Sequence, residues 1–195
     1  FTEFWPSDNT DPIERLFIQW GFSQVFPAKT MCAHVTTWNK NSSVKFRTDV
    51  AMMCKLGFDI KLADMSKDDE TYCRTAVQNY NRLKPVVLEG DMYRLVSPYG
   101  SNHTSTMYVG KDKDKAAVFA FDIHPRYAEK ILPVRLQGLD ADKMYRVKEI
   151  NLMPGANSSL SGNGEVFSGE FLMNVGLNLF TAQQLNSRVI EVVAE

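Results

Sequence analysis

Apolar residues follow two different periodicities along the chain, and the change between them comes near residue 90. Before it, apolar positions recur at helical spacing between short apolar runs, and Ile13, Leu16, Phe17 and Trp20 mark one such helix face. After it, short apolar runs are separated by turn-forming groups, a pattern typical of an antiparallel sandwich or barrel. The chain is therefore predicted to be α/β in its first part and β in its second.

The first part is predicted to contain three strands, each followed by a helix. The expected strands are residues 1–5, 29–37 and 58–62, and the expected helices are residues 11–23, 44–56 and 66–84. Ser66, with Asp69 three residues later, is the start signal of the last helix, and Pro85 is expected to stop it. Gly57 is predicted to cap the C-terminus of the preceding helix.

Seven short strands are predicted beyond residue 90. Their expected ranges are residues 93–97, 106–110, 116–124, 131–135, 145–150, 166–171 and 188–193. The turn signal Glu89-Gly90-Asp91 precedes the first of them. We therefore expect one domain at residues 1–89 and a second at residues 90–195.

Two acidic residues near the start of the chain have different predicted roles. Asp11 is followed by Pro12 and, three residues on, by Glu14, the order of an N-cap, a proline in the first turn and a carboxylate reaching back to the cap. Asp8 has no such duty and comes just after Trp5, where a strand would reach its C-terminal end. From the residues alone, Asp8 is equally well an ordinary turn aspartate or a group of an active site.

A series of short motifs runs through nearly the whole chain. They are Trp5-Pro-Ser-Asp8-Asn-Thr-Asp11-Pro, Arg15-Leu-Phe-Ile-Gln19-Trp20-Gly21, Ala33-His34-Val35, Arg47 with Val50-Ala51-Met52, Leu56-Gly57-Phe58-Asp59, Tyr93-Arg94-Leu95-Val96-Ser97-Pro98, Gly138-Leu139-Asp140 with Tyr145-Arg146-Val147, and Phe167-Ser168-Gly169 with Leu172-Met173-Asn174. In content and in order, these motifs resemble the C-terminal part of bacterial α-galactosidases of glycoside hydrolase family 36.

The resemblance implies a fold and a pair of site residues. The fold would be the C-terminal part, about three βα units, of a (β/α)8 barrel, followed by an antiparallel β-sandwich domain. Asp8 would be the general acid/base of a retaining glycosidase, and Trp5 would help to form the galactose pocket. The substrate would be a galactoside with a terminal α-linked galactose. No cofactor and no metal is expected, because two carboxylates and water suffice for this hydrolysis.

The resemblance also implies that this chain is a fragment. The family's nucleophile lies in a Lys-Trp-Asp motif, and no such motif occurs in these residues. A complete barrel takes about 250 residues, so 195 residues that also contain a β domain cannot hold one. We therefore expect the chain alone to be inactive. Separately, the resemblance implies that the parent enzyme is a homo-oligomer, often a tetramer in the bacterial enzymes of the family.

Two other functions compete with hydrolysis. One is a family 36 galactosyltransferase that builds raffinose-type oligosaccharides, in which a sugar replaces water as the acceptor. The other is a carbohydrate-binding role of the β-sandwich, in which exposed aromatic rings such as Tyr99, Tyr108 or Tyr127 stack on sugar.

Three further polar residues near the predicted strands have structural interpretations that we favour over functional ones. His34 is expected to be satisfied by a backbone partner more readily than to contact substrate. Arg47 is expected to pair with a carboxylate, and Asp59 is expected to make a structural hydrogen bond.

Composition restricts the possible partners. A formal net charge of −1, from 22 basic and 23 acidic residues, gives no electrostatic reason to expect nucleic acid or an anionic membrane as a partner. No apolar run approaches the roughly 20 residues of a membrane span. Cys32, Cys54 and Cys73 lack disulfide or zinc spacing and are expected to be free thiols, which weakly favours the cytoplasm.

Overall fold

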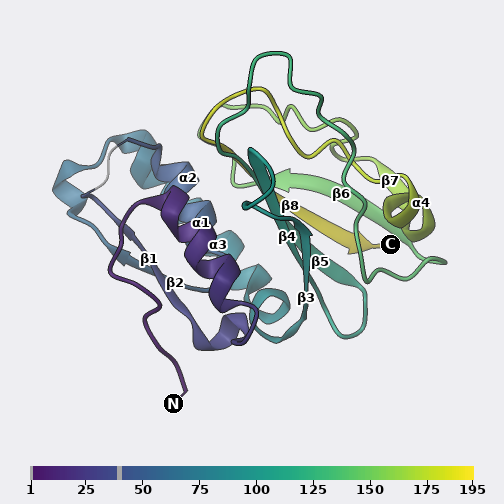
Figure 1. Cartoon of the computed structure of the whole chain (residues 1–195), viewed down its shortest axis with the longest axis horizontal. Helices are drawn as coiled ribbons and strands as arrows, with labels where there is room; N and C mark the ends of the chain where they lie inside the picture. Colours follow the sequence, from purple (N-terminus) through teal and green to yellow (C-terminus); the bar gives the residue numbers. More distant parts are fainter. Residues whose placement is uncertain (1, 39–40) are drawn as a thin grey trace.

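The structure, a computed structural model, describes residues 2–38 and 41–195. Three helices lie between a small parallel sheet and a large antiparallel sheet (Figure 1). The elements of the first part are α1 (Pro12–Phe22), a 3-10 turn (Ala28–Thr30), β1 (Cys32–Thr36), α2 (Val44–Ala51), β2 (Lys55–Asp59), a second 3-10 turn (Leu62–Asp64) and α3 (Lys67–Glu89). Strands and helices therefore alternate, as the sequence predicts.

The small sheet has the parallel geometry expected of a barrel segment. β1 pairs with β2 in parallel, with His34 opposite Gly57. The segment before α1 joins the other edge of β1 through one parallel bridge, between Phe4 and Met31. The Phe4 amide donates to the Thr30 carbonyl at 2.8 Å, and the Cys32 amide donates to the Phe4 carbonyl at 2.9 Å. The strand expected at residues 1–5 is thus a single bridge among the described residues, and Phe1 lies outside them.

Two predicted boundaries in the first part are wrong. α2 ends at Ala51 and β2 already begins at Lys55, so Gly57 is a strand residue paired with His34 and not a helix cap. α3 continues through Pro85 to Glu89. The residues after this proline, Val86–Leu88, are buried in the core, and their packing offsets the roughly 3 kcal/mol that an interior proline costs.

The second part forms one six-stranded antiparallel sheet, in the order β3-β4-β5-β8-β6-β7. Its elements are β3 (Asp91–Val96), β4 (His103–Val109), β5 (Lys115–Asp122), β6 (Met144–Ile150), β7 (Val166–Ser168), α4 (Gly169–Asn174) and β8 (Asn186–Ala194). One residue, Gly90, separates the end of α3 from the start of β3.

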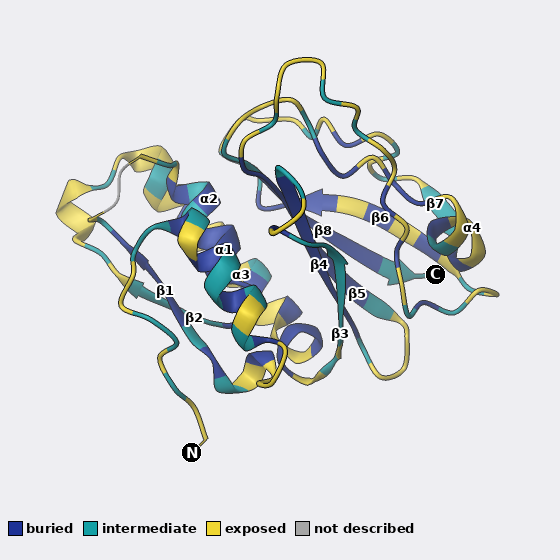
Figure 2. Ribbon diagram, in the orientation of Figure 1, coloured by how far each residue is buried: buried dark blue, intermediate teal, exposed yellow. Residues whose placement is uncertain are grey.

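Both faces of the central strands are buried (Figure 2). Alternate residues of β5 enter two different cores: Phe119 and Phe121 pack toward the helices, whereas Val118 packs toward α4 and the coil segments on the far face. The layers are consistent with part of a barrel followed by a sandwich. The far layer is mostly irregular in the described residues, where Val134 and Leu177 form an isolated antiparallel bridge.

Two of the strands predicted in the second part are wrong. Residues 131–135 contribute only the bridge at Val134. Residues 166–171 divide into β7 and the start of α4, because Ser168 caps the helix by accepting a hydrogen bond from the Phe171 amide at 3.1 Å.

A buried carboxylate links the helices to the sheet. Asp49 of α2 is fully buried. Four donors reach its oxygens: Lys45 Nζ at 2.6 Å, Ser187 Oγ at 2.7 Å, Tyr72 Oη at 2.8 Å and Asn151 Nδ2 at 2.9 Å. These donors come from α2, α3, β8 and the residue after β6. Because the four donors satisfy the carboxylate, its charge is tolerated in the core.

We expect Asp49→Ala to lower the free energy of unfolding by about 3–5 kcal/mol, because it leaves a half-buried ammonium and three polar groups without their shared acceptor. Urea unfolding followed by circular dichroism measures the loss. Glu70→Ala, which removes an exposed ion pair with Arg74, is the control and is expected to change little. Equally small losses in both variants would show that the Asp49 network does not hold the layers together.

Candidate active site

The two carboxylates of the loop before α1 make different contacts, as the sequence predicts. Asp11 caps α1: its Oδ1 accepts from the amides of Ile13 at 2.8 Å and Glu14 at 3.1 Å. Glu14 was expected to reach back to the cap, but the Asp11 amide donates to Asn9 Oδ1 at 2.8 Å instead. The helix terminus is thus satisfied without Asp8.

Asp8 lies exposed at the carboxyl-terminal edge of the parallel strands. It follows the bridge at Phe4, and because the strands are parallel, its loop lies at the same edge as the ends of β1 and β2. In the described part of the chain, its carboxylate makes no hydrogen bond. Asp8 is therefore free to act on a ligand at this edge.

Trp5 lies against the ring of His34. The two ring centroids are 4.3 Å apart and the ring planes are tilted by 35°. Trp5 is 50% exposed, whereas His34 is 8% exposed. The indole is therefore supported by the imidazole and still presents half of its surface to solvent.

Arg15 joins this pair from α1. Its Nη2 lies 3.0 Å from His34 Nδ1 and donates to the Ser7 carbonyl at 3.3 Å. Arg15 is only 3% exposed. A guanidinium can only donate, so His34 Nδ1 must accept this hydrogen bond.

Burial lowers the pKa of His34, and the positive charge of Arg15 lowers it further, while Asp59 and Asp8 act in the opposite direction. Burial also lowers the pKa of Arg15, an effect opposed by negative charge that includes Asp8. His34 is thus held neutral near pH 7, in the form whose Nδ1 accepts. The side chains of Trp5, Asp8, Arg15, His34 and Asp59 form one cluster, which we call the rim cluster.

The structure corrects the interpretations of His34 and Asp59 but not that of Arg47. His34 is satisfied by a side chain, that of Arg15, and not by a backbone partner. Arg47 donates to two carbonyls, those of Thr36 at 2.5 Å and Ser43 at 3.4 Å, and its expected pairing with a carboxylate stays a prediction. Asp59 is exposed and makes no hydrogen bond within residues 2–38 and 41–195, so its expected structural bond is absent there.

The proposed aromatic platform of the β domain is incomplete. Tyr108 is buried, and its hydroxyl donates to the Met53 carbonyl at 2.8 Å. Tyr99 packs edge-on against Phe17 at 5.2 Å, and Tyr127 is fully exposed. Tyr108 is therefore a core residue and cannot stack on a sugar.

Comparisons with known proteins identify the family of this chain. Residues 1–90 match the Melibiase family, and residues 103–192 match the Glycosyl hydrolase family 36 C-terminal domain. The chain belongs to glycoside hydrolase family 36. It corresponds to the C-terminal region of the family's α-galactosidases.

Family 36 relatives come from fungi and from bacteria. Alpha-galactosidase 2 of Hypocrea jecorina is 34% identical over 97% of this chain, which covers 24% of that protein. The crystal structure of AgaB from Geobacillus stearothermophilus superposes with a TM-score of 0.85 at 28% identity, over 99% of this chain and 26% of that one. The galactosidase domain of AgaSK gives a TM-score of 0.85 at 27% identity, over 100% of this chain and 26% of that one. The chain spans about a quarter of the length of these relatives.

Sequence reasoning assigned no role to Arg15 in this family 36 site. A signal was available, because Arg15 lies next to Leu16 and four residues before Gln19, and both of these are buried with it on one face of α1. A charged residue on a buried helix face needs a specific partner. That partner, His34, is 19 residues away and could not be identified without the fold.

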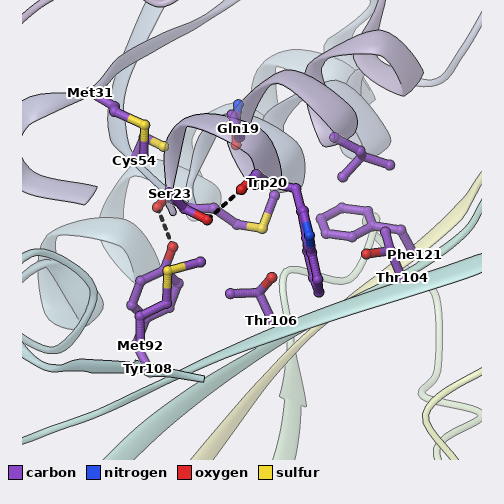
Figure 3. A pocket seen from close by; sticks show the side chains of 12 residues that line it. Gln19, Trp20, Ser23, Met31, Cys54, Met92, Thr104, Thr106, Tyr108 and Phe121 are labelled. Carbon is purple, nitrogen blue, oxygen red and sulfur yellow. Dashed lines mark hydrogen bonds between the residues drawn. The ribbon is translucent and has the colours of Figure 1, made fainter. Parts of the chain in front are cut away.

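The protein also encloses a space that is too small for a ligand. It is a cavity of about 10 Å³ between α1 and the large sheet, lined in part by Gln19, Thr106 and Tyr108 (Figure 3). Ser23 Oγ donates to the Trp20 carbonyl at 2.7 Å beside it. This volume admits at most about one water molecule, so it belongs to the packing of α1.

The three cysteines are free, as expected. Burial raises the pKa of Cys54 to about 12 and that of Cys73 to about 11, so neither thiol is reactive near neutral pH. The described residues contain no group of three or more His, Cys, Asp or Glu side chains suited to a metal ion. Within the same residues, no helix is long and apolar enough to cross a membrane.

The cap at Asp11 gives a stability prediction. We expect Asp11→Ala to cost about 1 kcal/mol, since two amides of the first turn of α1 lose their acceptor. Asp11→Asn keeps an acceptor and is the matched control, with only a small expected loss. Thermal unfolding of the two variants beside the unsubstituted chain measures the difference. Equal stability of all three would contradict the capping role.

Proposed function

We propose that this chain is the C-terminal region of a retaining α-galactosidase, with Asp8 as its general acid/base. The observation that carries the proposal is the carboxylate of Asp8, which is exposed at the C-terminal edge of the parallel strands, near Trp5, and makes no hydrogen bond within residues 2–38 and 41–195. Its neighbour Asp11 is occupied as a helix cap. Relatives named α-galactosidases support the reaction class, and crystal structures of AgaA variants in complex with raffinose and stachyose support a galactoside substrate.

In the proposed reaction, Asp8 protonates the departing glycosidic oxygen and later removes a proton from the attacking water. A second carboxylate, about 5–5.5 Å away, must attack the anomeric carbon between these two steps. We propose that this nucleophile lies in another part of the enzyme. The chain spans only about a quarter of the length of its relatives. The chain alone is then inactive.

The proposed function assigns a task to each part of the chain. Residues 1–89 would be the end of the catalytic barrel, and residues 90–195 the domain on which its helices rest. Trp5, supported on one face by His34 and half exposed, would form a wall of the galactose pocket. The tetrameric assembly that the resemblance implies stays a prediction.

The transferase differs from the hydrolase only in the acceptor that attacks the galactosyl intermediate. Product analysis at high acceptor concentration distinguishes the two. An independent sugar-binding role of the β domain has less support, because of its three candidate platforms one is buried and another packs on α1.

We expect Asp8→Ala in the complete enzyme to lower kcat/KM for galacto-oligosaccharides by about 10²–10⁴-fold, because their leaving groups need a proton. The first step with an activated aryl galactoside is expected to be nearly unchanged, because that leaving group departs unprotonated. Steady-state and pre-steady-state kinetics measure both effects. Asp11→Asn is the control. Equal losses for both kinds of substrate in Asp8→Ala would rule out the acid role.

A further inference from the structure

His34 supports Trp5 from beneath and does not face the solvent itself. The imidazole lies 4.3 Å from the indole, centroid to centroid, and is almost fully buried, while the indole is half exposed. A ligand at the strand edge would therefore meet Trp5 before it could meet His34. The position of His34 is that of a support, not of a group that contacts substrate.

The edge of the same imidazole is fixed by Arg15. The guanidinium Nη2 lies 3.0 Å from His34 Nδ1 and also donates to the Ser7 carbonyl at 3.3 Å. Ser7 is the residue directly before Asp8. One nitrogen thus ties the support of Trp5 to the backbone next to Asp8.

Arg15 makes these hydrogen bonds from a buried position. It stands in the first turns of α1, behind the Asp11 cap, and is buried. Its Nε is buried without a hydrogen-bond partner in the described residues. Within those residues, the hydrogen bonds of its Nη2 go to the Ser7 carbonyl and to His34. Retaining a buried guanidinium for these bonds is costly in a core, which argues for a purpose beyond packing.

We propose that His34 and Arg15 are positioning residues that hold Trp5 and Asp8 in register for galactoside binding, with the neutral Nδ1 of His34 as the acceptor that locks the pair. This inference rests on the proposed function of Asp8 and Trp5. The indole is fixed by its contact with the imidazole, and the imidazole is fixed by the guanidinium. Small displacements of such groups reduce substrate binding and turnover.

The arrangement has a pH dependence with a definite sign. The charged groups that act on His34 are Arg15 from α1, Asp59 from β2 and Asp8 from the loop. Burial and Arg15 lower its pKa below the ordinary value of about 6.5, so the accepting form is present above that pH. As the pH falls through the lowered pKa, Nδ1 gains a proton, can no longer accept, and faces a guanidinium. The hydrogen bond from Arg15 to His34 Nδ1 is then lost.

Two substitutions in the complete enzyme separate the two contacts of His34. His34→Asn keeps an acceptor near Nδ1 but removes the ring beneath Trp5. We expect it to weaken galactose binding about tenfold, measured by calorimetry at pH 7.5, and to raise KM more than it lowers kcat. His34→Phe keeps a flat ring but cannot be protonated. Because phenylalanine offers Arg15 no acceptor, we expect this variant to bind galactose at pH 7.5 as weakly as the unsubstituted enzyme does once His34 is protonated, and to show no further decline in affinity as the pH falls.

A double-mutant cycle with Trp5→Ala tests whether His34 acts through Trp5. We expect kcat/KM of Trp5→Ala combined with His34→Asn to equal that of Trp5→Ala alone within about twofold, because the support has nothing left to hold. Additive losses would overturn the proposal, and so would an unchanged affinity in His34→Asn or an unchanged acid-side decline in His34→Phe. Failure of the unsubstituted enzyme to bind galactose or cleave galactosides would instead contradict the proposed function.

Discussion

The buried carboxylate of Asp49 is the interaction on which the arrangement of the layers depends. Its four donors come from two helices and from the large sheet, so the sheet cannot shift against α2 and α3 without leaving a charge unsatisfied in the core. β1 and β2 lie on the other side of these helices (Figure 1). The strands that carry His34 and Asp59 therefore have their position set by the antiparallel sheet, although no strand of that sheet belongs to the rim cluster.

The features of the fold that could be predicted depend on residues close together in the sequence. Asp11 and Ser66 each mark the start of a helix through residues within four positions, and both caps form as expected. The errors occur where distant packing decides. Gly57 resembles a helix cap in sequence, but its backbone is needed opposite His34 in the parallel sheet. Pro85 would end a helix, but α3 continues through it because the residues that follow are buried in the core. Residues 131–135 were predicted as a strand from their alternation, but they form only one isolated bridge.

The candidate site divides in the same way. Asp8 could be separated from Asp11 because capping is a local pattern, and the resemblance to family 36 then gave it and Trp5 a proposed chemistry. The support beneath them could not be found in this way, since Arg15 and His34 meet across 19 residues and come from a helix and a strand. Both residues are buried, yet they contact the loop that carries Trp5 and Asp8, and only the fold reveals this combination.

The central claim is that Asp8 is the acid/base and that the nucleophile is another residue. Azide with the Asp8→Ala form of the complete enzyme tests it directly, because an anion needs no general base to attack a galactosyl-enzyme intermediate. Attack occurs on the face that the leaving group vacated, so the account predicts recovered turnover of an aryl galactoside with α-galactosyl azide as product. Formation of β-galactosyl azide would show that the nucleophile had been removed, and the absence of any azide product would equally contradict the assignment.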